Sequence, residues 1–468
     1  MDFPVFFVDH IGNRLIIAVI AILHVFINHP LAVGAYPLVT LMEWLGWKQG
    51  SEQIDRLAYK VTMVLFIVTT TIGALTGVGI WFTTAVIAPF GIGSLLRIFF
   101  WAWFIEWLVF ITEVVLILIY FLTWKQWKEG FMKKVHIGVG IVLSLFSWLT
   151  MAIIVAILGF MMDAGSWPLD RSLTSAFFNP LYAPQSLFRT TYALMTAGLC
   201  VWFLLFFFTQ KGTDLRRKAV RFVSIWTLAW VPPFIVGALW YWNVVPEAMM
   251  KNLDVALLTQ AFQNWHETLA HIMVAALAAI ILTAVIGLTR PRLINGVLLL
   301  VPFLLGIWLL GHFERVREFV RKPYVVADYM YSNGVRLADY PVYKRDGVLT
   351  HATFVAHKRV TEANLIEAGQ DIFRIACARC HTTTGINSTV DKFNNLYGEG
   401  RWDPEVMGLF VETMHNTRTY MPPFPGNQRE LDALVAYLKD LEQTHAPLSG
   451  AQSRGIPKAV NPDPDARL

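Results

Sequence analysis

Eight long apolar runs occupy the first two thirds of the chain. A helix needs about 20 residues to cross the hydrocarbon core of a bilayer, and each run reaches that length. The pattern therefore predicts an all-α transmembrane bundle of about eight helices. The runs cover residues 13–35, 60–82, 96–123, 135–161, 187–209, 219–242, 258–288 and 292–312.

After the last run, the alternation of apolar and polar positions becomes typical of a soluble protein. Residues 313–361 mix polar, aromatic and charged positions and are expected to form a post-membrane linker. Residues 362–445 are expected to form a small soluble helical domain, because apolar positions recur at helical spacing near both of its ends. The tail, 446–468, is rich in Pro, Ala and Asp and is expected to be disordered.

The composition agrees with a protein that crosses a lipid bilayer many times. Hydrophobic residues make up 56% of the chain and charged residues only 15%, whereas about a quarter of a soluble protein is charged. A net charge of +5 over 468 residues gives no reason to expect a nucleic-acid partner. Residues 1–12 lack the basic stretch and the cleavage site of a signal peptide, so the first run is expected to direct insertion.

Basic residues concentrate in alternate connections between the runs. The other connections hold almost none: residues 83–95 have no Lys or Arg, 162–186 have Arg171 alone and 243–257 have Lys251 alone. The positive-inside rule places the basic connections in the cytoplasm. The N-terminus and the C-terminal domain are then expected in the periplasm, on a bacterial inner membrane. The basic connections carry Lys48, Arg56, Lys60, Lys125, Lys128, Lys133, Lys134, Lys211, Arg216, Arg217, Lys218, Arg221, Arg290 and Arg292.

One short motif carries the clearest chemistry. Cys377-Ala-Arg-Cys380-His381 has the spacing of covalent heme c attachment, in which two thioethers hold the porphyrin edge and the histidine ligates the iron. Met421, in Tyr-Met-Pro-Pro-Phe, is the expected sixth ligand, and ligation by His and Met suits electron transfer. These signals in this order resemble class I cytochrome c over residues 362–445.

Zinc binding is the alternative interpretation of the two cysteines. A structural zinc site needs a fourth ligand and commonly a second cluster. Neither is evident here, although His415 is nearby. With three cysteines in the chain, a disulfide framework is not expected either.

Ionisable side chains inside apolar runs are costly and point to function. Imidazole is the natural axial ligand of a b-type heme, and His24, His271 and His312 are the expected ligands. His29 and His266 are further candidates. His266 and His271 lie about 140° apart around a helix and cannot both face one iron, and the same holds for His24 and His29.

Two acidic residues share the third run. Glu106 and Glu113 are expected to act in proton delivery or to contact a heme propionate. A carboxyl in an apolar helix needs a partner from another helix. Arg189, at the start of the fifth run, is the expected partner of Glu106, directly or through a heme propionate. His136 borders lysines and is expected at the membrane interface.

The membrane part resembles subunit I of cytochrome bd oxidases over residues 10–330. The resemblance implies b-type hemes in the bundle, leaves a heme d open, and implies a second, homologous membrane subunit. It rests on segments that follow the family's order: His24 with His29-Pro-Leu, Gly73-Ala-Leu-Thr-Gly77, Phe104-Ile-Glu106 through Glu113, Phe188-Arg189-Thr, Ala270-His271-Ile-Met273 and Arg321-Lys-Pro323-Tyr324.

Three features of the sequence depart from that family. Arg189 stands where the family has a ligating histidine, and His312 lies close to the place of a ligating glutamate. The connection from Tyr241 to Val255 is too short for the family's quinol-binding loop. Periplasmic electron carriers that reduce the fused cytochrome c would then replace quinol as the donor.

The leading hypothesis is a bd-like terminal oxidase subunit, in which electrons pass from one heme c to one or two b-type hemes. One alternative is a membrane cytochrome that relays electrons between the membrane and periplasmic carriers through six-coordinate irons. Another is a cytochrome c anchored by a helix bundle that binds no heme. These three interpretations differ in the number of hemes and in whether any iron has an open position.

Overall fold

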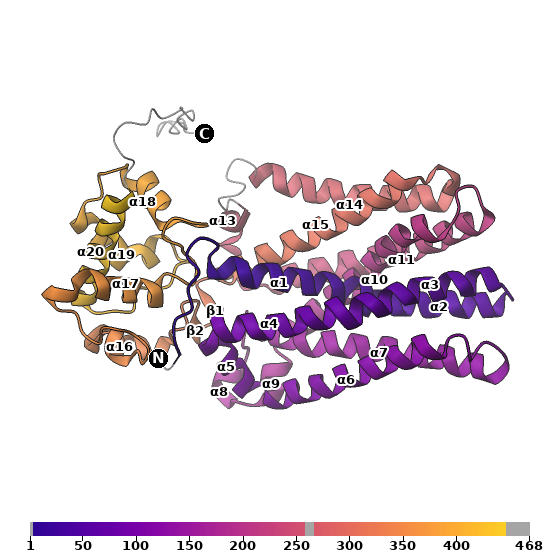
Figure 1. Cartoon of the computed structure of the whole chain (residues 1–468), viewed down its shortest axis with the longest axis horizontal. Coiled ribbons are helices and arrows are strands. Elements are labelled where there is room, and N and C mark those ends of the chain that lie inside the picture. Colours follow the sequence, from indigo (N-terminus) through magenta and orange to yellow (C-terminus); the bar gives the residue numbers. More distant parts are fainter. Residues whose placement is uncertain (1–2, 258–265, 446–468) are drawn as a thin grey trace.

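The computed structural model describes residues 3–257 and 266–445, and most of this part of the chain is helical. The long axis of the molecule is set by a bundle of parallel and antiparallel helices, and a smaller helical region caps one end of the bundle (Figure 1). We call the capped end the junction end and the opposite end the far end. The predicted tail, 446–468, lies outside the described residues.

Eight helical spans in the described residues are long and apolar enough to cross a membrane, which confirms the predicted number. Most coincide with the apolar runs. The seventh is described only from His266, so the first part of the predicted run 258–288 lies outside the described residues. The spans are Asn13–Lys48, Glu52–Ile87, Phe100–Thr123, Gly130–Phe160, Tyr182–Phe208, Asp214–Val244, His271–Thr289 and Gly296–Val320.

The first two spans are longer than their apolar runs, with 36 residues each. In the first, α1 (Asn13–Ile27) and α2 (Tyr36–Lys48) are joined by a π-helical segment, η1 (Asn28–Ala35). Pro30 lies in η1 and has no N–H to donate, and a π-helical turn lets the helix continue past it. The second span likewise contains α3 (Glu52–Val68), the π-helical η2 (Thr69–Gly73) and α4 (Ala74–Ile87).

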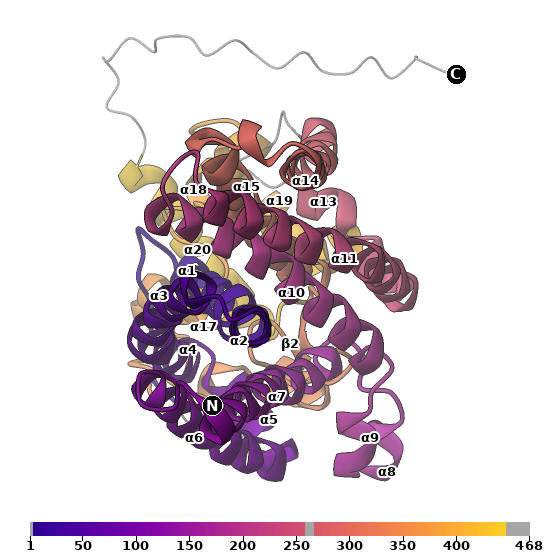
Figure 2. The same ribbon diagram turned by 90° about the vertical axis from the view of Figure 1, so that its right-hand side faces the viewer.

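The bundle has two parts, seen nearly end-on in Figure 2. The first four spans form one part, in which α6 (Phe100–Thr123) and α7 (Gly130–Phe160) pack on each other, α6 packs on α3, and α7 packs on α2 and η1. The second part contains α11 (Asp214–Val244), α14 (His266–Thr289) and α15 (Gly296–Val320). Between them lies α10 (Tyr182–Phe208), the most buried span, which contacts both parts.

The last span extends beyond the predicted run, which ends at residue 312. The additional turns of α15 carry charges that pair along the helix: Arg317 Nε lies 2.9 Å from Glu314 Oε2, and Arg321 Nη2 lies 2.7 Å from Glu318 Oε1. Pairs three residues apart on a helix support it. Part of the segment expected as linker therefore continues the membrane helix.

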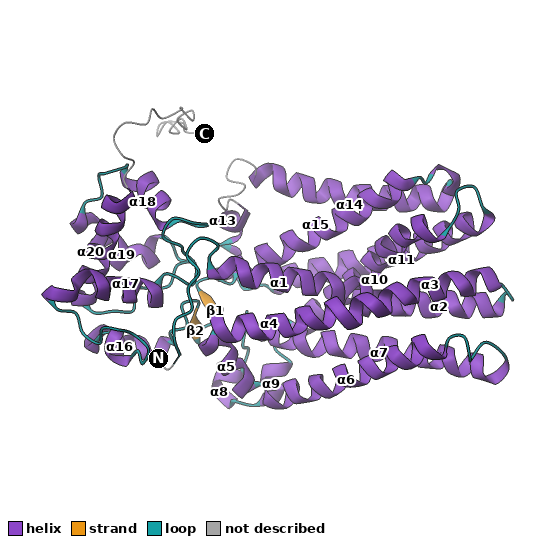
Figure 3. Ribbon diagram, viewed as in Figure 1, coloured by secondary structure: helices purple, strands orange, loops and turns teal. Residues whose placement is uncertain are grey.

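Short elements cover the junction end. After α15, strands β1 (Tyr324–Val326) and β2 (Met330–Tyr331) pair antiparallel in the one sheet of the described residues, drawn in orange in Figure 3. The short helices there are α5 (Pro89–Ile98), α8 (Trp167–Asp170), α9 (Leu173–Phe177), α12 (Glu247–Met250) and α13 (Leu253–Leu257).

The C-terminal region begins with η5 (Leu337–Asp339), α16 (Tyr340–Asp346), η6 (Leu349–His351) and η7 (Glu362–Asn364). Its main helices are α17 (Leu365–Ala376), α18 (Thr389–Tyr397), α19 (Pro404–Thr417) and α20 (Gln428–His445). Helices α17 and α20 cross in close contact around a core that includes Phe373, Leu434 and Leu438.

The crossing of α17 and α20 requires a glycine. A Cβ atom on Gly369 would lie 2.0 Å from the Ala433 backbone oxygen, so any side chain there would push the helices apart. On the other side of α20, a Cβ on Gly408 of α19 would meet nothing closer than 3.8 Å. An added methyl group would therefore clash at Gly369 but fit without strain at Gly408.

We expect Gly369→Ala to lower the free energy of unfolding of the C-terminal region by at least about 1–3 kcal/mol, because the added methyl overpacks the crossing. Gly408→Ala is the matched control and should leave stability unchanged or raise it by up to about 1 kcal/mol. Denaturant unfolding followed by tryptophan fluorescence and circular dichroism measures both. Equal stability of the two variants would contradict the claim that the α17–α20 crossing requires glycine at position 369.

Candidate heme sites

The cysteine motif forms a tight turn at the end of α17. Cys377 N–H donates to the Phe373 oxygen at 2.8 Å, and His381 N–H donates to the Cys377 oxygen at 3.0 Å. This extra turn brings Cys377, Cys380 and His381 to the wall of one cavity. The two sulfurs and the imidazole are therefore placed as covalent attachment of one porphyrin requires.

The imidazole of His381 is held by its own loop. Its Nδ1 lies 3.3 Å from the Asn387 oxygen, which leaves Nε2 as the nitrogen for an iron. Burial, together with the positive charge of Lys392, lowers the pKa of His381 to about 4. The ring is therefore neutral at physiological pH, the form that ligates a metal.

Met421 lies on the same cavity, in the loop between α19 and α20. Met421 N–H donates to the Arg418 oxygen at 2.8 Å, and His415 Nδ1 lies 2.5 Å from the Met421 oxygen. His415 is thus hydrogen-bonded to the methionine loop. In the part of the chain that the structure describes, no three His, Cys, Asp or Glu side chains gather to hold a metal.

The shared cavity has a volume of about 490 Å³. This is within the range of pockets that enclose cofactor-sized molecules. Its walls combine apolar side chains with cations, which suit a flat apolar macrocycle that carries two carboxylates. The cations are Arg14, Arg315, Lys322, Arg379, Lys392 and Arg418. The donor set and the walls fit a heme c with His and Met ligands.

Two membrane helices contribute to this cavity. Arg14, Leu15 and Ala18 belong to the first turns of α1, and Arg315 and Phe319 belong to the last turns of α15. The cavity therefore opens toward the bundle, and its walls come from both the C-terminal region and the membrane helices. No sequence pattern indicated Arg14 or Arg315, because they lie more than 60 residues from the motif in the chain.

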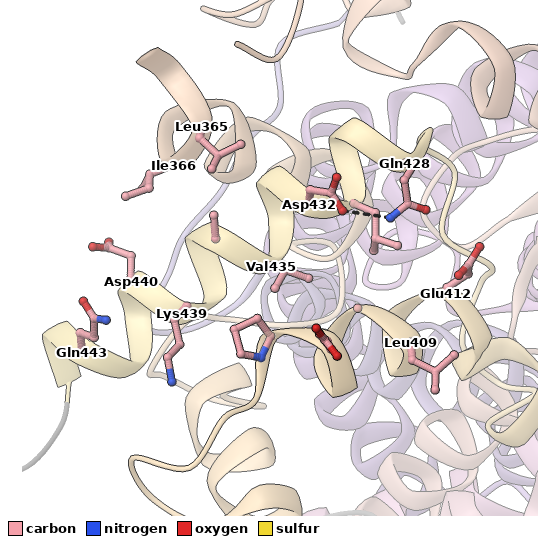
Figure 4. A pocket seen from close by; sticks show the side chains of 15 residues that line it. Leu365, Ile366, Leu409, Glu412, Gln428, Asp432, Val435, Lys439, Asp440 and Gln443 are labelled. Atoms are coloured by element: carbon pink, nitrogen blue, oxygen red, sulfur yellow. Dashed lines mark hydrogen bonds between the residues drawn. The ribbon is translucent and has the colours of Figure 1, made fainter. Parts of the chain in front are cut away.

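A second, more open groove lies on the outer face of the C-terminal region, between α19 and α20 (Figure 4). Leu409 and Val435 form apolar parts of it, and Glu412, Asp432 and Asp440 make its edges acidic. It contains neither the cysteines nor the candidate ligands. Helix α20 separates it from the heme c cavity, because Leu434 and Leu438 line that cavity from the same helix.

His24 lies in the last turn of α1, half-buried against α4. Its Nδ1 is 3.1 Å from Thr76 Oγ1, and a Cβ on Gly77 would lie 3.2 Å from its Cε1. Gly77, noted in the sequence for its resemblance to the family segment, is thus in contact with the expected ligand. The ring is thus held in place by α4.

His29 and Arg189 belong to a buried charged cluster. His29 Nε2 lies 3.1 Å from Arg189 Nη1, which lies 2.8 Å from Glu314 Oε1. Arg317 pairs with the same glutamate. The direct pair of Arg189 with Glu106 is not formed: Arg189 pairs with Glu314, which α15 brings to α10 because that helix continues past residue 312. A link between Arg189 and Glu106 through a heme propionate stays a prediction.

His312 and His271 lie on the two other helices that were expected to supply ligands. His312 of α15 is half-buried, and its ring lies on Trp308 with centroids 4.1 Å apart. His271 of α14 is exposed. His266 is the first residue of α14, and its side chain lies outside the described residues.

Glu113 is buried and fully hydrogen-bonded. Ser147 donates to its Oε1 at 2.6 Å and Thr150 to its Oε2 at 3.0 Å, both from α7. Glu106 lies seven residues earlier on the same face of α6 and is half-buried. The two carboxyls thus lie one above the other, separated by about 10 Å along the helix axis.

His136, expected at the membrane interface, lies in the second turn of α7, and its side chain is fully buried within the protein. Its level relative to the membrane stays a prediction. Its Nδ1 lies 2.6 Å from Glu43 Oε1, and Tyr120 donates to the other oxygen of Glu43 at 2.7 Å. Lys133 bridges Glu43 and Asp55 at 2.7 and 2.6 Å. A glutamate inside the extended first span was the signal that could have revealed this cluster.

The C-terminal region and the bundle each have a known counterpart. Residues 364–438 match the family described as cytochrome c oxidase, cbb3-type, subunit III. The structure is similar to the bd oxidase from Geobacillus thermodenitrificans, with a TM-score of 0.57, 14% sequence identity and coverage of 67% of this chain and 87% of that chain. A comparison with curated proteins gives no match.

These findings confirm the architecture that the sequence suggested. The chain has a membrane part with the fold of a bd oxidase chain, fused to a C-terminal cytochrome c domain. It is a multi-pass membrane protein of heme electron transfer, and the cytochrome c domain supports heme c as a cofactor.

Covalent heme attachment should depend on the two motif cysteines. We expect the double variant Cys377→Ala with Cys380→Ala to lose heme staining on a denaturing gel, because no thioether remains to hold the porphyrin. Cys200→Ala is the control: Cys200 is buried in α10, away from the cavity, and its loss should leave staining intact. Persistent staining of the double variant would contradict the heme c site.

Proposed function

We propose that this chain is a subunit of a bd-like oxidase that takes electrons at its heme c and passes them to b-type hemes in the bundle, where O2 is reduced to water. His24, His312 and His271 are the proposed ligands in the bundle, and a heme d in place of one b-type heme is compatible with the proposal. Bound hemes supply the electron carriers and the site of O2 binding. A second membrane subunit and a soluble periplasmic donor complete the proposed assembly.

One observation carries the proposal: the walls of the heme c cavity belong to the same helices as two of the proposed ligands. Ala18 lines the cavity, and His24 follows six residues later on α1, about 9 Å along the helix axis. Arg315 lines it as well, and His312 lies one turn earlier on α15. The proposed donor and acceptor sites are therefore separated by two helical turns or fewer of protein.

The buried arginine at α10 supports cofactor binding in the bundle. Among the residues that the structure describes, Nε and Nη2 of Arg189 have no hydrogen-bond partner, and neither has Nδ1 of His29. Leaving such groups unpaired in an apolar interior costs about 1–3 kcal/mol each. A heme propionate beside Arg189 would satisfy them, and it would give this position a role although the family's histidine is replaced.

The proposal assigns proton handling to α6. Glu113 is held by Ser147 and Thr150, and Glu106 lies about two turns farther toward the junction end on the same face of α6. Each would take up and release a proton at a carboxyl oxygen. Reduction of O2 consumes protons, and carboxyls in an apolar bundle can carry them to it. The buried pair would otherwise be costly to keep in a membrane helix.

The proposed orientation puts the C-terminal domain in the periplasm. The basic connections between spans 1 and 2, 3 and 4, 5 and 6, and 7 and 8 join helices at the far end of the bundle (Figure 1). The positive-inside rule assigns that end to the cytoplasm. Heme c would then lie on the side where soluble electron carriers are found.

The oxidase is tested by the binding of CO, which requires an iron with an open position. We expect reduced membranes to give a CO-difference signal of the b or d type, and we expect His24→Ala to abolish it because the proximal ligand is lost. His445→Ala, at the end of α20, should leave the signal unchanged. A wild-type protein with no such signal would overturn the oxidase in favour of an electron relay with six-coordinate irons or a bundle that binds no heme. An unchanged signal in His24→Ala would refute His24 as a ligand.

A further inference from the structure

Residues 3–12, which we call the N-terminal strap, cross from the bundle to the cytochrome c domain before α1 begins. The strap is fixed on the bundle side by Asn13, a buried residue at the start of α1. Asn13 Nδ2 donates to the Phe6 oxygen at 2.6 Å, and Val8 N–H donates to Asn13 Oδ1 at 3.1 Å. The Phe3 ring also lies against Phe90 of α5, with centroids 5.3 Å apart.

The other side of the strap contacts the loop that follows the heme ligand. Asp9 Oδ1 accepts a hydrogen bond from Thr383 N–H at 2.6 Å, and Asp9 Oδ2 accepts one from the Thr383 hydroxyl. Ile386 N–H donates to the His10 oxygen at 3.0 Å. Thr383 is two residues after His381, so the strap holds the ligand's own loop.

The fit between strap and loop is close. A Cβ on Gly385 would lie 2.1 Å from the His10 oxygen, so the strap backbone can reach the loop only because this residue is glycine. The Phe7 ring packs edge-on against Phe373 of α17, with centroids 6.2 Å apart. The strap thereby contacts both the loop and the helix that carry the heme motif.

The methionine side of the cavity is held separately. Tyr340 donates to the Pro423 oxygen at 2.9 Å, and the Tyr420 ring lies 5.5 Å from that of Phe319 at the end of α15. Each ligand loop of the heme c site is thus tied to a different helix of the bundle: the histidine loop to α1 and the methionine loop to α15.

We propose that Asp9 is a positioning residue for electron transfer: it fixes the histidine loop of the heme c domain on the start of α1, the helix that carries His24. Its carboxylate makes charge-assisted hydrogen bonds to both the backbone and the side chain of Thr383, which are stronger than neutral ones. The inference rests on the proposed function, because it needs a heme acceptor in the bundle. The separation between donor and acceptor sites is then set by the strap as well as by the polypeptide link through residues 321–361.

The test measures the transfer step itself in the full chain in detergent, without O2. A flash-excited ruthenium complex reduces heme c, and the later reduction of the bundle heme is followed at its own absorption band. Asp9→Ala is expected to slow this transfer by about tenfold or more, because two charge-assisted hydrogen bonds that hold the docked arrangement are lost. Asp9→Asn retains an acceptor without the charge and should give an intermediate rate.

Asp432→Asn is the matched control. Asp432 is exposed on the open groove behind α20 and is hydrogen-bonded to Gln428. The rate of electron transfer in the Asp432→Asn variant should therefore equal that of the wild type. The absorption spectrum and reduction potential of heme c should be unchanged in all variants. A fall in the rate with an unchanged heme c is what separates positioning from a general loss of stability.

The outcomes distinguish the two proposals. Transfer in the wild type at the same rate as in Asp9→Ala overturns the role of Asp9 and leaves the proposed function standing. A wild type with no transfer overturns the proposed function, and the role of Asp9 with it. Hydrogen exchange in the unmutated protein needs no variant: the amides of Thr383 and Ile386 should be protected, and exchange as fast as in an open loop would overturn the strap contact.

Discussion

The architecture depends on the contact between the cytochrome c domain and the junction end of the bundle. A heme c cavity could have been formed by the C-terminal region alone, with its mouth open to solvent. Here the first turns of α1 and the last turns of α15 complete its walls. Because these helices also carry His24 and His312, the contact that closes the cavity also sets the separation between the two proposed kinds of heme site.

The bundle contains two clusters of buried charged side chains. His29, Arg189, Glu314 and Arg317 form a cluster in the bundle, and Glu43, Lys133 and His136 form another near the far end. Buried ion pairs seldom add net stability, because desolvation offsets their attraction, but removal of one partner leaves an uncompensated charge. Such clusters are retained more readily where they serve a cofactor or proton transfer, and the cluster around Arg189 lies between α10 and α15, which carry proposed site residues.

Local patterns in the sequence predicted what local physics determines. Runs of apolar residues gave the number of spans, and the Cys377-to-His381 spacing with the Met421 loop gave residues that share one cavity. The continuation of the first span from residue 35 to Lys48 was not predictable from hydropathy, because α2 carries Glu43 and Lys48 and depends on packing against α3 and α7. Helix α15 likewise continues through charged residues that pair with each other.

Contacts between distant residues account for the remaining differences. The buried His136 is hydrogen-bonded to Glu43, which is 93 positions away, and Arg189 meets Glu314 across two helices. The strap contact joins Asp9 to Thr383, 374 positions apart. Asp9 and Thr383 belong to no sequence motif or apolar periodicity, so no sequence pattern could have paired them. Only the fold brings together residues of this separation.

The central claim is that a covalent heme c and at least one histidine-held heme share this chain. Pyridine hemochrome analysis with iron determination on the purified protein tests it most directly. The account predicts one covalently bound heme c per chain together with one or more extractable hemes, and iron in equal number. A single iron per chain, all of it in heme c, would contradict the account and leave a cytochrome c anchored by a bundle that binds no heme.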